Sequence, residues 1–185
     1  ACHVHLSREH VEALFGPGYK LTAREELSQP GQFACEETVT LVGPRAKVEK
    51  VRILGPERKE SQVEISMTEE YALGIHARLR ISGDLEGSPR VTLEGPKGTL
   101  VLDKGLILAQ KHIHMSPEEA LSFGLMDRDV VQVMAAGGGP VFGDVEVRVR
   151  PNFRLSMHID TDEAAAAKVR TGQLGVLTSL QHRRH

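Results

Sequence analysis

A short histidine pattern occurs twice in this chain of 185 residues. His3-Val-His-Leu-Ser7 returns 109 residues later as His112-Ile-His-Met-Ser116, and after each copy comes a helical segment that a glycine ends. This period is too long for a solenoid, whose units repeat every ~20–50 residues. We therefore expect two related halves, residues 1–108 and 109–185, with an insertion at 17–37 in the first half.

A second pair of similar segments supports the two halves. Val63-Glu-Ile-Ser66 resembles Met157-His-Ile-Asp160, and an acidic helix start follows each of them. In two halves of the same fold, Glu64 and His158 would occupy corresponding positions. Each half then offers one His-x-His pair and one further side chain that is able to bind a metal ion.

The pattern of apolar residues favours a mainly β fold. Short apolar runs are separated by Gly-Pro turns, and Val145-Glu-Val-Arg-Val149 alternates with period two, as half-buried strands do. Many short strands favour a barrel or a sandwich over a parallel α/β sheet. Short helices are expected at Ser7–Phe15, at Ser116–Gly124, and near Thr68 and Asp160. The expected strands are 39–42, 48–54, 62–65, 91–93, 100–102, 106–109, 130–134, 145–149, 155–159 and 175–177.

Composition excludes several classes of protein. The chain has 23 Lys and Arg against 25 Asp and Glu, which argues against a nucleic-acid or anionic-membrane partner. No apolar run approaches the ~20 residues of a membrane span and no signal peptide opens the chain, so we expect no membrane partner and a cytoplasmic location. The two cysteines, Cys2 and Cys35, exclude a disulfide framework and fit a reducing compartment.

The paired histidines predict a metal site. Residues i and i+2 of a strand point to the same face, so each His-x-His presents two imidazoles together. Imidazole and carboxylate together suit zinc and similar ions. A single pair would be explained as well by surface or capping histidines, and the duplication is what favours metal. The candidate ligands are His3, His5, Glu64, His112, His114 and His158.

Other reactive side chains are expected to be structural. In a strand, Cys2 faces away from His3, so we do not expect it to bind metal. Cys35 lies in a polar, loop-like stretch and is expected to be an ordinary thiol. We expect His10 to be a solvated residue on a helix surface and His76 to lie at a helix end, while His182 and His185 belong to a basic tail.

Nucleotide and nucleophile motifs are missing from the sequence. It has no Walker A or Gly-x-Gly-x-x-Gly pattern and no Gly-x-Ser-x-Gly elbow, which leaves metal-assisted chemistry as the first enzymatic class. Arg58 precedes Glu64 by six residues, where a guanidinium is well placed to bind a substrate anion. Spacing alone leaves a plain surface arginine as the alternative.

Longer stretches of the sequence resemble the PduL-type phosphotransacylases, also called phosphate propanoyltransferases, over nearly the whole chain. They are His3-Val-His-Leu-Ser7, Gln62-Val-Glu-Ile-Ser66, Leu79-Arg-Ile-Ser-Gly-Asp84, His112-Ile-His-Met-Ser-Pro-Glu-Glu-Ala120 and Met157-His-Ile-Asp-Thr-Asp-Glu163. The resemblance implies an acyltransferase that interconverts acyl-CoA (propanoyl-CoA or acetyl-CoA) and phosphate with acyl phosphate and CoA. It also implies two related small β-barrels capped by short helices, with an active site of two zinc ions between them.

The resemblance also implies a role for each site residue. His3 and His5 would hold one zinc ion, whose shell a CoA sulfur or water completes, and Arg58 would bind phosphate. The other zinc ion would be held by Glu64, His112, His114 and His158. The two halves would then form one catalytic unit. A homodimer is a weaker implication of the same resemblance.

Two further readings remain open at this point. The same metal site could serve a hydrolase that uses water as the nucleophile on a thioester or related ester. Alternatively, zinc could hold together the two halves of a non-catalytic structural protein. Members of the family that enter the lumen of bacterial microcompartments carry an N-terminal amphipathic targeting peptide. The present sequence shows no such peptide and so does not support residence in the lumen; we expect a cytoplasmic location, with the microcompartment lumen as the alternative.

Overall fold

A computed structural model describes residues 1–184, so His185 lies outside the described residues. The mainly β class expected from the sequence is confirmed. In chain order the elements are β1 (His3–His5), α1 (Arg8–Phe15), β2 (Ala23–Glu26), β3 (Phe33–Val42), β4 (Lys47–Gly55), β5 (Gln62–Ile65), α2 (Met67–Leu73), β6 (Leu79–Arg80), β7 (Val91–Gly95), β8 (Gly98–Leu102), β9 (Leu106–Ala109), β10 (His112–Met115), α3 (Pro117–Phe123), β11 (Val130–Ala135), β12 (Val141–Val149), β13 (Ser156–His158), α4 (Thr161–Ala167) and β14 (Gly175–His182).

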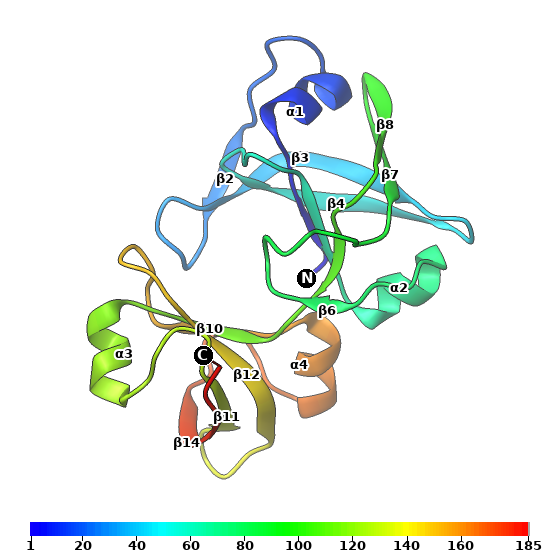
Figure 1. Cartoon of the computed structure of the whole chain (residues 1–185). Coiled ribbons are helices and arrows are strands. Elements are labelled where there is room, and N and C mark those ends of the chain that lie inside the picture. Colours follow the sequence, from blue (N-terminus) through cyan, green and yellow to red (C-terminus); the bar gives the residue numbers. More distant parts are fainter. Residues whose placement is uncertain (185) are drawn as a thin grey trace. The chain divides into compact units, whose positions relative to one another are not determined.

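The chain divides into two compact units (Figure 1). Unit 1 contains residues 1–27 and 31–109, and unit 2 contains the described residues from 110 onward together with the short segment 28–30. The division after residue 109 lies one residue from the expected boundary. Segment 28–30 falls inside the stretch expected to be an insertion of the first half, yet its contacts are with unit 2.

Unit 1 is built on a nine-stranded sheet that curls like half of a barrel (Figure 1). The strands follow the order β6-β9-β5-β1-β4-β3-β7-β8, and β2 pairs with β3 beside this path. The strand β1 pairs in parallel with β4 and antiparallel with β5. The first histidine pair therefore lies in the middle of the sheet rather than at an edge.

Unit 2 is built on a five-stranded sheet in the order β13-β10-β12-β11-β14. Its strand β10 carries the second histidine pair, and it pairs in parallel with β12 and antiparallel with β13. These five strands reproduce β5-β1-β4-β3-β7 of unit 1 in spatial order, in chain order and in every strand direction. Each unit thus contains one copy of the same five-stranded arrangement, in which the histidine strand lies between a parallel and an antiparallel neighbour.

Helices occupy matching places in the two copies. In each unit, one helix follows the histidine strand (α1 or α3) and another follows its antiparallel neighbour (α2 or α4). Ser7 and Ser116 cap α1 and α3 through their hydroxyl oxygens, and Gly16 and Gly124 end these helices, as the sequence predicted. The helix expected near Thr68 begins slightly earlier, because Ser66 is its N-cap.

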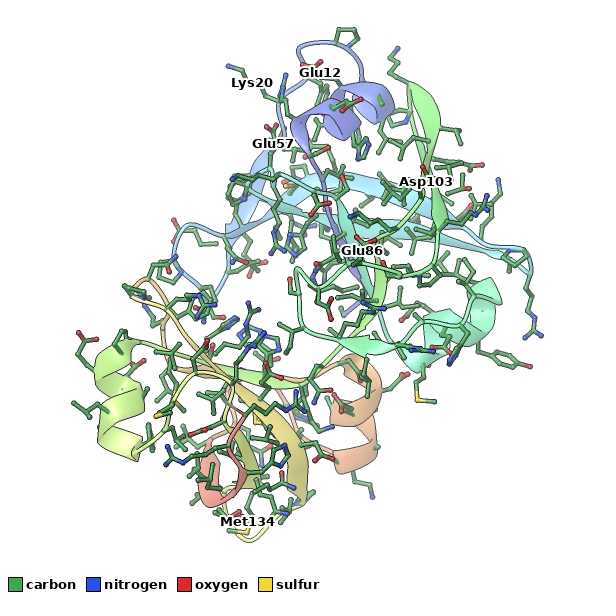
Figure 2. All side chains as sticks on the ribbon, viewed as in Figure 1. Glu12, Lys20, Glu57, Glu86, Asp103 and Met134 are labelled. Carbon is green, nitrogen blue, oxygen red and sulfur yellow. The ribbon has the colours of Figure 1, made fainter. Side chains whose placement is uncertain are left out.

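All ten expected strands are present, and each unit has its own apolar core. Charged side chains such as Lys20, Glu86 and Asp103 lie on the outer surface of unit 1 (Figure 2). The expectation for Cys35 was wrong, because this residue lies in β3 and is completely buried in the core of unit 1. Across residues 1–184, no helix is long and apolar enough to cross a membrane.

Candidate metal and phosphate site

Strand register brings three metal-binding side chains together in each unit. In unit 1, His3 of β1 lies directly opposite Glu64 of β5, and in unit 2, His112 of β10 lies opposite His158 of β13. His5 and His114 are two residues further along their strands, on the same face. The result is a unit 1 ligand group (His3, His5 and Glu64) and a unit 2 ligand group (His112, His114 and His158).

The donor atoms within each ligand group are close enough to share one ion, since all of them lie within 4.8 Å of one another. In unit 1, the Nε2 atoms of His3 and His5 lie 3.4 and 3.8 Å from the two carboxylate oxygens of Glu64. In unit 2, the ring centroids of His112 and His158 are 5.2 Å apart, and those of His112 and His114 are 4.7 Å apart. Such a donor set fits zinc.

Backbone carbonyls orient the first histidine of each pair. His3 Nδ1 lies 2.8 Å from the carbonyl oxygen of Ala1, and His112 Nδ1 lies 2.7 Å from that of Gln110. Because a carbonyl only accepts, Nδ1 must carry a proton in both rings, and Nε2 is the ring atom that remains to bind a metal ion. This is the usual outer-shell arrangement of metal-binding histidines, and it occurs at equivalent positions in both units.

The electrostatics of the unit 1 ligand group favour metal-competent protonation states. Burial and the nearby charges of Arg58 and His3 together lower the pKa of His5 to about 3, so His5 is neutral at pH 7. Burial opposes ionisation of Glu64, but His3, His5 and Arg58 outweigh it and hold the pKa of this carboxyl well below its usual range. A neutral imidazole and an ionised carboxylate are the forms that bind a cation.

A buried amide joins Glu64 to Arg58. Gln62 is 1% exposed, and its Nε2 donates to Glu64 Oε1 at 2.5 Å and to Ser82 Oγ at 2.8 Å. Arg58 Nη1 donates to the same Ser82 oxygen at 3.0 Å, so Ser82 links the guanidinium to the amide. The Gln62 oxygen accepts the backbone N–H of Gly83, which completes the bonding of the amide.

A second buried amide supports the unit 2 ligand group. Gln29, in segment 28–30, donates from Nε2 to the Arg154 carbonyl and to Ser156 Oγ, and Ser156 Oγ lies 2.9 Å from His158 Nε2. Phe153 packs edge-on against His114, with ring centroids 4.3 Å apart. Gln29 thus supports the strand that carries the candidate ligand His158, about 125 residues away along the sequence.

The six candidate ligands predicted from the sequence all lie in these two groups, whereas not all of their neighbours were predicted. Gln62 had a usable signal, because it shares the inward face of β5 with Glu64. Ser82 and Gln29 had none, since only the tertiary fold brings them to the site. Within unit 1, Glu64 lies beside His3 and His5, and the zinc assignment implied by the family resemblance stays a prediction.

The remaining candidates lie outside the ligand groups. Cys2 packs against the core of unit 1, and burial raises the pKa of its thiol to about 12. His76 is exposed and pairs with Glu70, and His182 ends the exposed strand β14. The expectation for His10 was wrong, because its Nδ1 lies 2.6 Å from the hydroxyl of buried Ser61 instead of being solvated.

Taken together, the duplicated sheet and its two ligand groups define a mainly β protein with candidate metal-binding groups at equivalent strand positions. Comparisons with known proteins make the class specific. The family model described as phosphate propanoyltransferase matches residues 1–170, and the chain belongs to this family. It is therefore an acyltransferase of the phosphotransacylase type, which uses acyl-CoA and phosphate as substrates.

Individual relatives agree along most of the chain. A phosphate propanoyltransferase of Thermotoga maritima is 54% identical over 174 residues, which is 93% of this chain and 83% of the relative. The phosphate propanoyltransferase of Priestia megaterium is 51% identical and covers 96% of this chain and 82% of the relative. That of Salmonella typhimurium is 51% identical, with 89% of this chain and 79% of the relative covered.

Proposed function

We propose that the chain transfers a short acyl group, propanoyl or acetyl, between CoA and phosphate, with one zinc ion in each ligand group. The observation that carries the proposal is the pair of ligand groups at equivalent register, each with a first histidine whose Nδ1 is bonded to a carbonyl. When bound, zinc supplies a Lewis acid that polarises the thioester carbonyl and stabilises the leaving thiolate. Both ligand groups are needed, so the units act as one catalytic unit.

Arg58 is proposed to bind the phosphate substrate. Its side chain is half-buried, bonded to Ser82, and close enough to the unit 1 ligand group to lower the pKa values of His5 and Glu64. A guanidinium is a planar fork of N–H donors that matches the geometry of phosphate oxygens. It orients a phosphate oxygen for attack and offsets the negative charge that this nucleophile brings.

The reaction is proposed to be a direct attack of a phosphate oxygen on the thioester carbonyl carbon. A new C–O bond forms, the C–S bond breaks, and CoA leaves as the thiolate and takes up a proton from water. Both thiols are poor candidates for an acyl-enzyme intermediate, because burial raises the pKa of Cys2 to about 12 and that of Cys35 to about 11. Isolation of an acylated cysteine or serine would overturn direct attack.

The test combines metal analysis with an acyl-CoA assay. The purified protein should contain two zinc ions per chain and should form acyl phosphate from propanoyl-CoA or acetyl-CoA only when phosphate is present. His112→Ala should lose the zinc ion of unit 2 and the activity, whereas the exposed control His76→Ala should retain both. Thiol release that does not depend on phosphate would favour the hydrolase alternative. Full activity of the protein after removal of its metal would contradict the zinc proposal.

A second variant tests the role of Arg58. Arg58→Ala should raise the phosphate KM by about 100-fold and leave the zinc content and the KM for acyl-CoA unchanged. Loss of zinc in this variant would contradict a phosphate-binding role and indicate a structural one. The homodimer and the cytoplasmic location expected from the sequence stay predictions, which sedimentation and cell fractionation can address.

A further inference from the structure

The segment that carries Arg58 is an exposed loop with one buried side chain. This Arg58 loop (residues 56–61) connects β4 to β5, and among its members Ser61 is 5% exposed and Arg58 is half-buried. A surface loop is normally among the more mobile parts of a fold. If the guanidinium of Arg58 is to bind phosphate in one orientation, contacts with other parts of the fold must therefore hold its loop in place.

The fixing contacts come from the residues that directly follow the histidine pair of β1. The backbone N–H of Arg58 donates to the Leu6 carbonyl at 2.9 Å, and Ser7 and Arg58 form a parallel β-bridge. At the other end of the loop, Ser61 Oγ accepts the backbone N–H of Ser7 at 2.8 Å. The loop is thus attached at both ends to the junction between β1 and α1.

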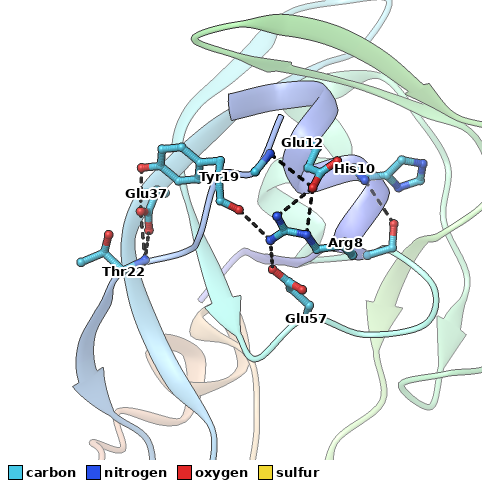
Figure 3. Close-up of polar contacts among 9 residues, drawn as sticks. Arg8, His10, Glu12, Tyr19, Thr22, Glu37 and Glu57 are labelled. Atoms are coloured by element: carbon cyan, nitrogen blue, oxygen red, sulfur yellow. Dashed lines mark hydrogen bonds and ion pairs between the residues drawn. The ribbon is translucent and has the colours of Figure 1, made fainter. Parts of the chain in front are cut away.

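His10 completes the buried attachment. It is in the first turn of α1, where its backbone N–H donates to the capping hydroxyl of Ser7 (Figure 3). Its ring Nδ1 lies 2.6 Å from Ser61 Oγ, so the hydroxyl that accepts the Ser7 N–H is bonded to the imidazole as well. A hydroxyl with two partners and little exposure has its position well defined.

A surface ion pair attaches the same loop to the same helix. Arg8 Nη1 lies 3.0 Å from Glu57 Oε1, and both side chains are at least 31% exposed (Figure 3). Exposed pairs of this kind contribute little to stability, because water and salt screen them. The Arg58 loop is therefore attached to α1 by the buried Ser61–His10 hydrogen bond and by the exposed Glu57–Arg8 ion pair. The exposed pair serves as a matched control for the buried one.

We infer that Ser61 and His10 form a hydrogen-bonded pair that positions the Arg58 loop for phosphate binding. This inference rests on the proposed role of Arg58. Both residues act through the loop: they hold the backbone of Arg58 beside β1, and neither is assigned a contact with substrate. Ser61 and His10 are therefore positioning residues for the phosphate nucleophile. Their role differs from that of Ser82, which accepts a hydrogen bond from Arg58 itself, and from that of Gln62, which donates to Ser82 and to the Glu64 carboxylate.

The experiment is a comparison of phosphate KM among variants of the zinc-loaded protein. Ser61→Ala and His10→Leu should each raise the phosphate KM by about tenfold, with unchanged zinc content and unchanged KM for acyl-CoA. Ser61→Thr and His10→Asn keep a hydroxyl and a hydrogen-bonding atom at the corresponding positions, and both should restore a phosphate KM close to that of the parent protein. Glu57→Gln should change it by less than about twofold.

Combined variants separate this inference from the proposed function. In an Arg58→Ala background, Ser61→Ala should have no further effect on the phosphate KM, because the group that it positions is gone. If Arg58→Ala itself leaves the phosphate KM unchanged, the proposed function of Arg58 fails. If Arg58→Ala raises it while Ser61→Ala and His10→Leu do not, or if Glu57→Gln matches their effect, only the positioning role fails.

Discussion

Gln62 is one buried amide that serves two functional side chains. It donates to Glu64, a proposed zinc ligand, and to Ser82, which in turn accepts from Arg58. Outer-shell residues of this kind hold a ligand in its binding geometry and keep a carboxylate oriented toward the ion. The proposed metal ligand Glu64 and the proposed phosphate-binding residue Arg58 are therefore both supported by Gln62.

Replacement of Gln62 by leucine should weaken zinc binding at unit 1. Leucine fills a similar volume but leaves Glu64 without the amide donor, and we expect about 10- to 100-fold lower affinity for one zinc ion of the two. Competition with a chromogenic chelator measures this directly. The half-buried Gln32→Leu is the control in the same unit and should titrate like the parent protein. Unchanged affinity in Gln62→Leu would show that Glu64 needs no such support.

Glu37 is a buried carboxylate whose role is structural. It accepts the hydroxyl of Tyr19 at 2.9 Å and the backbone N–H of Thr22 at 3.0 Å (Figure 3). Burial raises its pKa, but these hydrogen bonds outweigh burial and the net pKa is lowered. The carboxylate therefore stabilises the fold above the unfolded-state pKa of about 4.3, and this contribution is lost as the pH falls through the lower folded-state pKa.

Glu37→Gln should accordingly destabilise the protein in a pH-dependent manner. At pH 7 we expect a loss of about 1–3 kcal/mol in the free energy of unfolding. The difference from the parent protein should shrink as the pH falls below about 4. Urea unfolding at a series of pH values is the measurement, with exposed Glu36→Gln as the control. A difference that stays constant with pH would show that ionisation of Glu37 does not stabilise the fold.

Elements were more predictable than the contacts between them. Apolar runs identified the core strands because each strand of a buried sheet must be largely apolar, and serine caps with downstream glycines marked α1 and α3. β2 was missed because Ala-Arg-Glu-Glu is polar and all four residues are exposed beside β3. β6 has only two residues and leaves no periodic signal.

The cap of α3 offers a test at this scale. Ser116 Oγ accepts the N–H of Glu119, and the Glu119 carboxylate accepts the N–H of Ser116 in return. Ser116→Ala should lower the stability of unit 2 by about 1 kcal/mol. Exposed Ser122→Ala, later in the same helix, should change it by less than about 0.5 kcal/mol. Thermal unfolding would distinguish the two, and equal effects would argue against the cap.

For the whole molecule, the repeat was the most informative feature of the sequence. It predicted that Glu64 and His158 correspond, and strand register places both opposite the first histidine of a pair. The family resemblance instead assigns Glu64 to the zinc ion of the unit 2 histidines, and that assignment stays a prediction. The membership of segment 28–30 in unit 2 was not predictable, because it depends on the hydrogen bond from Gln29 to the Arg154 carbonyl, which forms only in the folded chain.

Gln29 should be important for the stability of unit 2. It is 4% exposed, and it bonds to both backbone groups of Arg154 as well as to Ser156. Gln29→Ala leaves those groups unsatisfied, and we expect a loss of about 2–4 kcal/mol in stability. Hydrogen exchange should speed up around β13 while β3 and β4 keep their protection. The exposed neighbour Ser28→Ala should leave exchange unchanged, and uniform effects in the two variants would contradict the prediction.

The two ligand groups differ in one side chain, and this difference suggests how the two copies of the sheet could have diverged. A carboxylate faces the first histidine in one copy and an imidazole faces it in the other. A divalent ion in the first setting would retain one formal positive charge, and in the second it would retain two, so the second would be the stronger electrophile. Duplication of an ancestral half followed by one codon change would suffice to turn two identical centres into a specialised pair.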